Sequence, residues 1–291
     1  MSDYLVRVIA RESGVRGLAC IATGLVNDAA RRHQASSTTA AVLGHGLTAA
    51  ALMGALLKVR QRVAIKFEGD GPARKIVVES DSYGHLRGYV QVPDVVLPHA
   101  VAPNDVAAAI GQAGLLTVAK DLGLKDLYKG VVPLQNGQVD SEIAHYLSRS
   151  EQVPSLVEIG VLLGQRDWVD VAGGLLFQTL PGQDAAILKD LAGRLDDLPP
   201  VEQMLAGGRS PEEILDQLLV KIPYEVLERR DLSFRCSCSR ERSAQAIRLL
   251  GRAEIESLIA EGEAVVDCHF CHERYIFDRA ELGEILEKVT G

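Results

Sequence analysis

Residues 236–271 read CSCSRERSAQAIRLLGRAEIESLIAEGEAVVDCHFC, and four of the chain's five cysteines stand at the two ends of this stretch. Cys236 and Cys238 form one close pair, Cys268 and Cys271 form the other, and 29 residues separate the two pairs. Zinc prefers a tetrahedral set of thiolate ligands, which two close pairs supply when folding brings them together. The stretch therefore predicts a site for one zinc ion per chain rather than four unrelated thiols.

Two other chemistries are compatible with part of this pattern. Residues 268–272 spell C-x-x-C-H, the attachment motif of c-type haem, but haem would leave Cys236 and Cys238 without a role. A thioredoxin-like redox pair normally follows a βαβ pattern, and none is predicted before Cys268. His269 and His272 could replace a thiolate, although four thiolates already complete a tetrahedral shell.

Many zinc-binding modules bind nucleic acid, and the charge of this region tests that possibility. Residues 232–291 contain eight Lys or Arg and eleven Asp or Glu, which gives a formal charge of -3. This balance favours solvated cations, or cations that offset thiolate charge, over a phosphate-binding surface. A zinc-ribbon adaptor for nucleic acid or protein stays the alternative because several basic residues lie near the first cysteine pair: Arg229, Arg230, Arg235, Arg240 and Arg242.

Helix and turn signals surround the cysteines. Ser239 is a candidate N-cap for a helix over 240–250, and a second short helix follows it. Residues 263–277 are typical of a hairpin around the second cysteine pair, and Asp278 with Glu281 forms a capping box for a last helix. This pattern predicts a small zinc-binding domain over residues 231–291.

The segment before it, residues 181–230, has a different texture. Ser210, Pro211 and Glu213 together form the start signal of a helix. Short amphipathic helices must dock their apolar stripes on another surface, so the segment is either an ordinary connector or a cover that docks and releases. The prolines that divide it are Pro181, Pro199, Pro200, Pro211 and Pro223. The apolar stripes consist of Ile187, Leu188, Leu191, Leu195, Ile214, Leu215, Leu218 and Leu219.

Residues 1–180 group their strands and helices rather than alternate them, which predicts an α+β fold with a β-rich core. Strands are expected over 4–9, 15–22, 156–163 and 168–178, and a β-meander over 63–68, 75–79 and 86–92. Helices are expected over 36–58 and 139–149. The predicted organisation is a core domain (1–180), a helical linker (181–230) and a zinc-binding domain (231–291), which the free energies and the family resemblance given below extend to a redox-switch domain.

Composition limits the function further. The 291 residues carry a formal net charge of -8 and only 4% aromatic residues, which argues against broad affinity for nucleic acid or anionic lipid. Thr38 to Leu57 contains no charged residue and is long enough to span a bilayer, but its Ala, Gly and Thr content and His45 favour a buried helix. The N-terminus has no signal-peptide pattern, so a cytoplasmic location is expected.

Free energies make a switch plausible at the cysteines. A structural zinc contributes roughly 10–16 kcal/mol of apparent binding energy. A disulfide within either close pair contributes roughly 1.5–2 kcal/mol by chain-entropy accounting. Oxidation would therefore unfold a domain of this size, which is marginal without metal. The physics of the sequence leaves a switch and a purely structural zinc site equally open.

At this point the chain resembles the heat shock protein 33 family of bacterial redox-regulated chaperones, over nearly its whole length. The two cysteine pairs and their spacing carry the resemblance. Three glycine-containing segments support it: Glu68-Gly69-Asp70-Gly71-Pro72, Gly111-Gln112-Ala113-Gly114, and Gly173-Gly174-Leu175-Leu176-Phe177-Gln178-Thr179-Leu180-Pro181. Cys20 lies outside the pattern and is expected to be a small buried apolar residue.

The resemblance implies a holding chaperone without catalytic residues. In the reduced state one zinc would be bound by the four cysteines, and the protein would be inactive. Oxidation would form disulfides Cys236–Cys238 and Cys268–Cys271, release zinc, and unfold the linker to expose its apolar residues to unfolded clients. The active form would be a homodimer that needs no ATP and binds no nucleic acid or membrane. The sequence contains no P-loop pattern, which agrees with ATP independence.

Overall fold

The computed structural model describes residues 2–98, 101–102, 104–164 and 168–289. The chain forms two compact units, Met1–Arg235 (the large unit) and Cys236–Gly291 (the cysteine unit). The division lies five residues after the expected boundary at 230/231, and residues 181–230 belong to the large unit. Contacts between residues thus divide the chain into two units. The division into core, linker and zinc-binding domain stays a prediction about function.

The large unit contains a five-stranded antiparallel sheet, here called sheet A. Its order is β10-β1-β2-β9-β8, so strands from the beginning, middle and end of the unit lie side by side. The four strands predicted here are confirmed with small shifts at their ends. The bounds are β1 Tyr4–Ala10, β2 Val15–Ile21, β8 Ser155–Leu163, β9 Val169–Thr179 and β10 Glu225–Asp231.

A second sheet, sheet B, has the order β11-β5-β4-β3-β6-β7. The predicted meander is confirmed as β3 to β5, whereas β6 and β7 were not predicted. All pairings are antiparallel except β11 with β5. The bounds are β3 Arg62–Gly69, β4 Lys75–Asp81, β5 His85–Val90, β6 Gly114–Asp121, β7 Tyr128–Pro133 and β11 Ser233–Phe234.

Helix α2 (Ser37–Gly54) is the centre of the large unit. The hydroxyl of Ser36 accepts a hydrogen bond from the Thr39 amide at 3.3 Å, which starts the helix as its sequence predicts. The helix contacts β4 and β5 of sheet B and β8 and β9 of sheet A, so it is buried around almost its whole circumference. Among the described residues, no helix has both the length and the apolar character needed to cross a membrane.

Three further helices complete this core. Helix α4 is confirmed within the predicted bounds, and α1 and α3 were not predicted. Cys20 of β2 is 1% exposed and belongs to the same apolar core, as expected for a small buried residue. The bounds are α1 Thr23–Arg32, α3 Val106–Ile110 and α4 Val139–Arg149.

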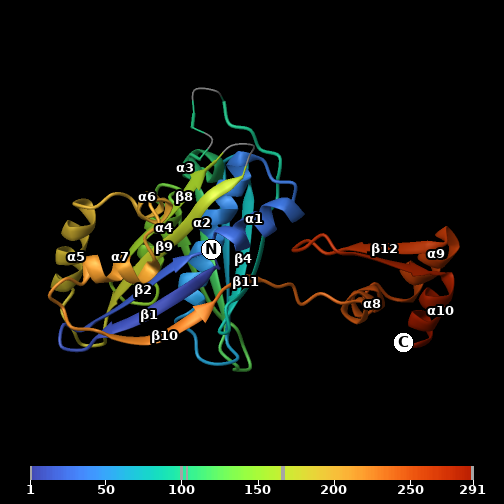
Figure 1. The fold of residues 1–291 in the computed structure, drawn as a ribbon. Helices are drawn as coiled ribbons and strands as arrows, with labels where there is room; N and C mark the ends of the chain where they lie inside the picture. Colours follow the sequence, from blue (N-terminus) through green and yellow to red (C-terminus); the bar gives the residue numbers. More distant parts are fainter. Residues whose placement is uncertain (1, 99–100, 103, 165–167, 290–291) are drawn as a thin grey trace. The chain divides into compact units, whose positions relative to one another are not determined.

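One face of sheet A contacts α2, and the other face is covered by three linker helices (Figure 1). These are α5 (Ala186–Asp196), α6 (Val201–Ala206) and α7 (Pro211–Leu218). The capping box of Ser210 and Glu213 is present at the start of α7. The expectation of helices throughout 181–230 is wrong at its end, since 225–230 belong to β10. This strand is exposed and charged, and its pairing with β1 is what makes it a strand.

The cysteine unit has its own small core. The predicted hairpin forms around the second cysteine pair, and the predicted helix starts at Ser239 and Asp278 are both present. The bounds are α8 Arg240–Arg248, α9 Arg252–Glu261, β12 Glu263–Asp267, β13 Arg274–Asp278 and α10 Arg279–Glu287. The buried apolar residues are Ile247, Ile255, Ala264, Phe277, Leu282 and Ile285.

Candidate metal centre

The four cysteines predicted as ligands come together in the cysteine unit. All four sulfurs lie within 4.8 Å of one another. The Sγ atoms of Cys236 and Cys268 are 3.6 Å apart, and those of Cys238 and Cys271 are 3.3 Å apart. No disulfide joins them. A tetrahedral zinc with Zn–S bonds of about 2.3 Å places its sulfurs about 3.8 Å apart, so the four side chains fit a metal ion of this kind.

The first cysteine pair lies in an irregular segment that ends at α8. The Ser239 hydroxyl accepts a hydrogen bond from the Arg242 amide at 3.3 Å and caps the helix. The Arg242 guanidinium donates to the Ser237 carbonyl and to its hydroxyl, each at 2.8 Å. These bonds hold Ser237, the residue between the two cysteines, against the first turn of α8.

The second pair lies in the turn of the β12–β13 hairpin. The Cys268 amide donates to the Glu273 carbonyl at 2.9 Å, and the His272 amide donates to the Cys268 carbonyl at 2.8 Å. His272 has a φ of 57°, a left-handed conformation that closes the turn. The turn therefore brings Cys268 and Cys271 to the same side. His272 contributes through its backbone, which is consistent with a four-thiolate site that needs no imidazole.

The surroundings of the sulfurs favour neutral thiols unless a cation is present. Burial raises the pKa of Cys238 and of Cys271 above the ordinary thiol value. The Tyr275 hydroxyl donates a hydrogen bond to the Cys238 sulfur at 3.3 Å. This bond raises the pKa of Tyr275, so the hydroxyl keeps the proton that it donates. A bound cation would stabilise the thiolates, because metal ligation favours their charged form.

Arg240 ties the first turn of α8 to the hairpin. Its guanidinium donates to both carboxylate oxygens of Glu281 at 2.7 Å and to the Ile276 carbonyl at 2.5 Å. The same group stacks over the Phe277 ring, 4.5 Å from its centroid. These contacts connect α8, β13 and α10 beside the cysteines. The sequence indicated Arg240 and Arg242 only as basic residues near the first cysteine pair, and it gave no indication of Tyr275, whose contact with Cys238 spans 37 residues of the chain.

The apolar linker residues are placed in the large unit. Six of them are at most 8% exposed, and Ile187 and Leu195 are partly buried; all pack on the outer face of sheet A. The docked helices therefore keep these residues away from solvent. The six are Leu188, Leu191, Ile214, Leu215, Leu218 and Leu219.

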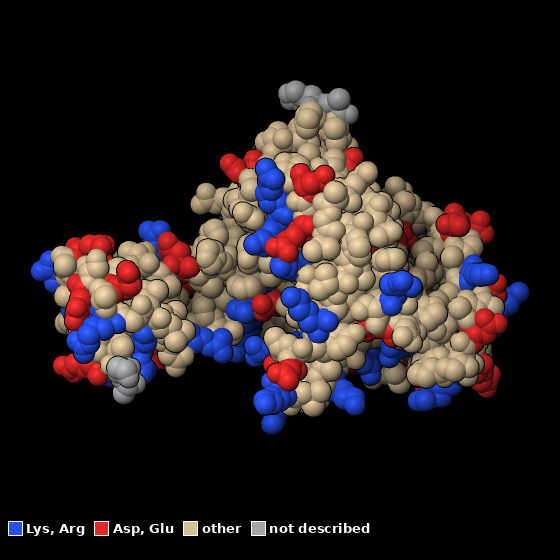
Figure 2. Space-filling view, turned by 180° about the vertical axis from the view of Figure 1, so that it is seen from behind, with Lys and Arg blue, Asp and Glu red and all other residues tan. Residues whose placement is uncertain are grey.

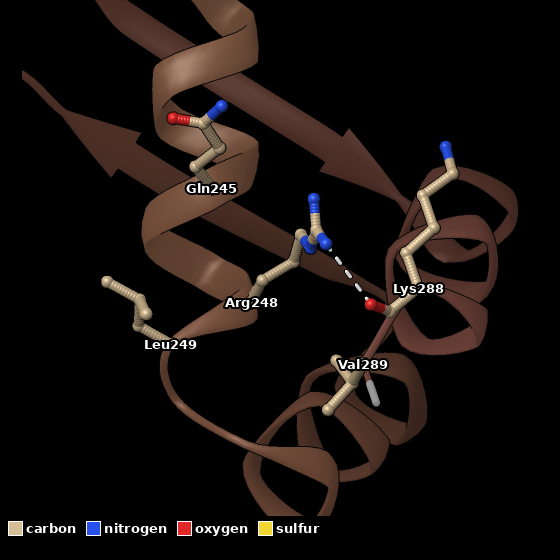
Figure 3. A pocket seen from close by; sticks show the side chains of 5 residues that line it. All are labelled: Gln245, Arg248, Leu249, Lys288 and Val289. Carbon is tan, nitrogen blue, oxygen red and sulfur yellow. Dashed lines mark hydrogen bonds between the residues drawn. The ribbon is translucent and has the colours of Figure 1, made fainter. Parts of the chain in front are cut away.

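A separate pocket of about 450 Å³ lies on the cysteine unit (Figure 3). It is lined by Gln245, Arg248, Leu249, Lys288 and Val289, and the Arg248 guanidinium reaches the Lys288 carbonyl. The lining shares no residue with the cysteine cluster and contains no carboxylate. Figure 2 shows acidic and basic side chains interspersed over the visible face, without a large field of one sign.

Comparison with known proteins identifies the relatives of this fold and cysteine cluster. A family model described as "Hsp33 protein" matches residues 3–278. The chain belongs to the Hsp33 family. A 33 kDa chaperonin of Citrifermentans bemidjiense is 47% identical over 100% of this chain and 99% of its own length. A second, from Geobacter sulfurreducens, is 47% identical over 100% of the chain and 97% of its own length.

The solved structures agree. The crystal structure of a 33 kDa chaperonin (heat shock protein 33 homolog) from Thermotoga maritima matches with a TM-score of 0.89 and 32% identity, over 98% of each chain. Hsp33 proteins are chaperones and not enzymes, and chaperones bind unfolded client proteins. The α+β fold, the family and the chaperone class expected from the sequence are thus confirmed, and the cysteine cluster fits a metal-binding, redox-active centre.

Proposed function

We propose that this Hsp33 protein is a redox-regulated, ATP-independent holding chaperone of the cytoplasm, with one zinc ion per chain bound by Cys236, Cys238, Cys268 and Cys271. The observation that carries the proposal is the cluster of four sulfurs within 4.8 Å, placed in a unit with a small apolar core. In the reduced state the bound ion stabilises this unit, and the linker helices stay docked on sheet A.

The metal dominates the stability of the cysteine unit. Six buried apolar residues give little hydrophobic stabilisation to 56 residues, which is the size range where small domains need a metal or disulfides. Zinc binding contributes roughly 10–16 kcal/mol, and a disulfide in a loop this short contributes roughly 1.5–2 kcal/mol. Exchange of the metal for local disulfides therefore unfolds the unit.

Oxidation needs a two-electron oxidant for each disulfide, and hydrogen peroxide is such an oxidant. One thiolate attacks a peroxide oxygen, giving a sulfenic acid and hydroxide. The second thiolate attacks the sulfenic sulfur, and hydroxide leaves as the S–S bond forms. Disulfides Cys236–Cys238 and Cys268–Cys271 would join residues within each pair only. The connection between the two halves of the site, supplied by thiolates on a shared ion, would then be lost.

Unfolding of the cysteine unit affects the linker helices through the chain segment that connects them. The linker helices are followed by β10 and β11, and Cys236 comes two residues after β11. Loss of structure at the cysteines leaves the pairings of β10 with β1 and of β11 with β5 as the remaining attachment at the C-terminal end of this segment. Short helices with one buried face have little stability of their own. Their release exposes the linker's apolar residues and the face of sheet A beneath them, which together form a surface for unfolded clients. An exposed face of this kind also supports a homodimer of the oxidised form.

The test combines three measurements on one sample of full-length protein. Zinc stoichiometry, free thiols and suppression of client aggregation by light scattering are followed before and after peroxide treatment at mildly elevated temperature. The expected result is about one zinc per reduced chain, loss of four thiols with release of the ion, and a gain in suppression. Oxidised, zinc-free protein that suppresses aggregation no better than reduced protein overturns the proposal.

Cys20 offers a matched control. It is buried in the core of the large unit, outside the cluster. Cys20→Ala should leave zinc binding and peroxide activation unchanged, whereas Cys268→Ser should weaken zinc binding and remove the peroxide response. Equal effects of the two variants would show that the response does not arise at the cluster.

A further inference from the structure

The hydroxyl of Tyr275 makes a contact that the cysteine pattern does not require. It donates a hydrogen bond to the Cys238 sulfur at 3.3 Å. Tyr275 lies on β13 and Cys238 lies before α8, so the bond joins two elements separated by 37 residues in the chain. The Tyr275 side chain is partly buried. Its hydroxyl is the group that contacts the cysteine cluster.

Neighbouring contacts hold both the strand that carries Tyr275 and the segment that carries Cys238 in place. Tyr275 and Phe277 lie two residues apart on one strand and therefore point to the same face of the hairpin. Arg240, two residues after Cys238, stacks on Phe277 and binds the Ile276 carbonyl. The strand that carries Tyr275 and the segment that carries Cys238 are thus tied together directly beside the bond. The contact is built into the packing of the unit and does not rest on one mobile side chain.

A hydrogen bond to a thiolate withdraws charge from the sulfur. It stabilises the charged ground state and leaves the lone pair less available for attack on an electrophile. Hydrogen bonds to metal-bound sulfur tune its reactivity and potential in the same way. We propose that Tyr275 is a positioning residue that lowers the nucleophilicity of Cys238 and so sets the peroxide threshold of the switch, an inference that rests on the proposed function.

The step affected is the first attack on the oxidant. The Cys238 thiolate gives two electrons to a peroxide oxygen, the O–O bond breaks, and sulfenic acid and hydroxide are formed. A neighbouring thiolate then displaces hydroxide as the S–S bond forms. Tyr275 keeps its proton throughout and takes no part in bond making. Its bond to the thiolate is weakened as the sulfur loses its negative charge, which raises the barrier to the first attack.

The test compares wild type with Tyr275→Phe, which removes only the hydroxyl. Reduced, zinc-loaded, full-length protein is treated with hydrogen peroxide, and the thiols are counted by mass tagging, with the Cys238 peptide quantified separately. The net strength of one hydrogen bond corresponds to roughly fivefold faster oxidation of Cys238 in the variant. Equal or slower oxidation overturns the inference.

A spectroscopic measurement separates tuning from loss of structure. Both proteins are loaded with Co²⁺, and the sulfur-to-cobalt charge-transfer band in the near ultraviolet is recorded. Removal of a hydrogen bond raises the energy of the sulfur lone pairs, so the band of Tyr275→Phe should move to longer wavelength while the tetrahedral visible bands keep their pattern. An unshifted charge-transfer band contradicts the inference.

Arg274 provides the control for general weakening of the hairpin. Its guanidinium binds the Asp267 carboxylate at 2.7 and 3.1 Å on the same two strands. Arg274→Gln removes this pair without removing the bond to sulfur. It should leave the cobalt band in place and the oxidation rate of Cys238 near that of wild type. A rate increase equal to that of Tyr275→Phe would assign the effect to hairpin stability and overturn the inference.

The outcome is independent of the proposed chaperone activity. Oxidation rates and the cobalt band are measured on the thiols themselves, without a client. If oxidised wild type suppresses no aggregation but Tyr275→Phe still oxidises faster, the proposed function fails and the role of Tyr275 stands. If oxidised wild type suppresses aggregation and the two proteins oxidise equally, the role of Tyr275 fails and the proposed function stands.

Discussion

The two faces of sheet A carry very different covers. Helix α2 lies on one face and is packed between both sheets, so nearly every side of its 18 residues is buried. The other face carries α5, α6 and α7, with 11, 6 and 8 residues, which bury one side and expose the other. Among these three, only α7 has a side-chain N-cap.

In the proposed function, this difference separates a core from a removable cover. A helix enclosed on all sides cannot leave without unfolding the domain, because its apolar residues would all lose their partners at once. A row of short helices with one buried face can leave the sheet intact, since each is unstable alone and gains only from that one contact. In the proposed function, the same sheet is a permanent scaffold on one side and a concealed binding surface on the other.

The largest effect is expected on the α2 side. Leu47 is fully buried in the centre of α2. Leu47→Ala removes apolar contacts and leaves a cavity, so the free energy of unfolding of the large unit should fall by about 2–5 kcal/mol. Urea or thermal unfolding of the reduced protein measures this change. A loss below about 1 kcal/mol would mean that α2 is not the core.

Leu215 is the matched position on the removable side. It is fully buried between α7 and sheet A. Leu215→Ala should cost about 2–3 kcal/mol, but the cost should appear as undocking of α5 to α7, with little change in the melting of the sheets. Limited proteolysis and binding of an apolar dye to reduced protein would detect the undocking. If the sheets melt earlier by the same amount as in Leu47→Ala, the two covers are one cooperative unit.

A smaller effect is expected where β8 meets α6. A Cβ atom on Gly160 would lie 2.0 Å from Glu202 Oε2 and 2.8 Å from its Cβ, and these linker atoms are the nearest ones to it. Gly160→Ala should therefore displace α6 at a cost of about 1–2 kcal/mol and make the chaperone easier to activate. Hydrogen exchange of the α6 amides is the measurement.

Gly193 in α5 is its control, because a Cβ there meets no atom within 4 Å. Gly193→Ala favours the helix by about 0.5–1 kcal/mol and should slow exchange in α5. The two alanine substitutions thus change the cover in opposite directions. Changes of the same sign would show that packing at Gly160 does not govern docking.

The smallest effect concerns pH. Glu158 of β8 accepts a hydrogen bond from the Val201 amide at 2.9 Å, at the start of α6. Burial raises its pKa, and the carboxylates of Glu202, Asp140 and Asp196 raise it further. The docked state thus binds the proton more tightly than the released state. Docking is strongest below the ordinary carboxyl pKa and weakens as pH rises through the docked-state pKa.

Glu158→Gln keeps an acceptor for the Val201 amide and removes the charge. The variant should hold α6 more tightly than wild type near neutral pH and should lose the pH dependence. Amide exchange of α6, measured relative to α2 between about pH 4 and pH 8, gives the comparison. Weaker docking in the variant at neutral pH would show that the hydrogen bond matters more than the burial of charge.

Local signals in the sequence accounted for much of the fold. The caps predicted at Ser210, Ser239 and Asp278 are all present, because a cap satisfies backbone amides within a few residues of itself. The meander of β3 to β5 followed from alternation and turn residues. The missed helix α1 has an apolar face but no side-chain cap at Ala22.

One of the missed strands, β10, depends on a partner that is distant in the chain. The sequence of β10 is largely charged and exposed, and its register opposite β1 exists only once the first and last parts of the large unit meet. The linker was accordingly expected to be helical up to residue 230. Long-range pairing overrides local preference in this way because strand propensity depends on the neighbouring strands.

For the metal centre, the sequence by itself determined the four cysteines, since thiolate type and paired spacing are properties of the chain. It also determined the apolar stripes of the linker, because helical periodicity is local. Only the tertiary structure decided what those groups meet. It placed Tyr275 on Cys238, Arg240 on Phe277 and the linker stripes on one face of sheet A. Contacts between residues far apart in the chain leave no mark in the spacing of a motif, and the proposed roles in thiol reactivity and linker release rest on these contacts.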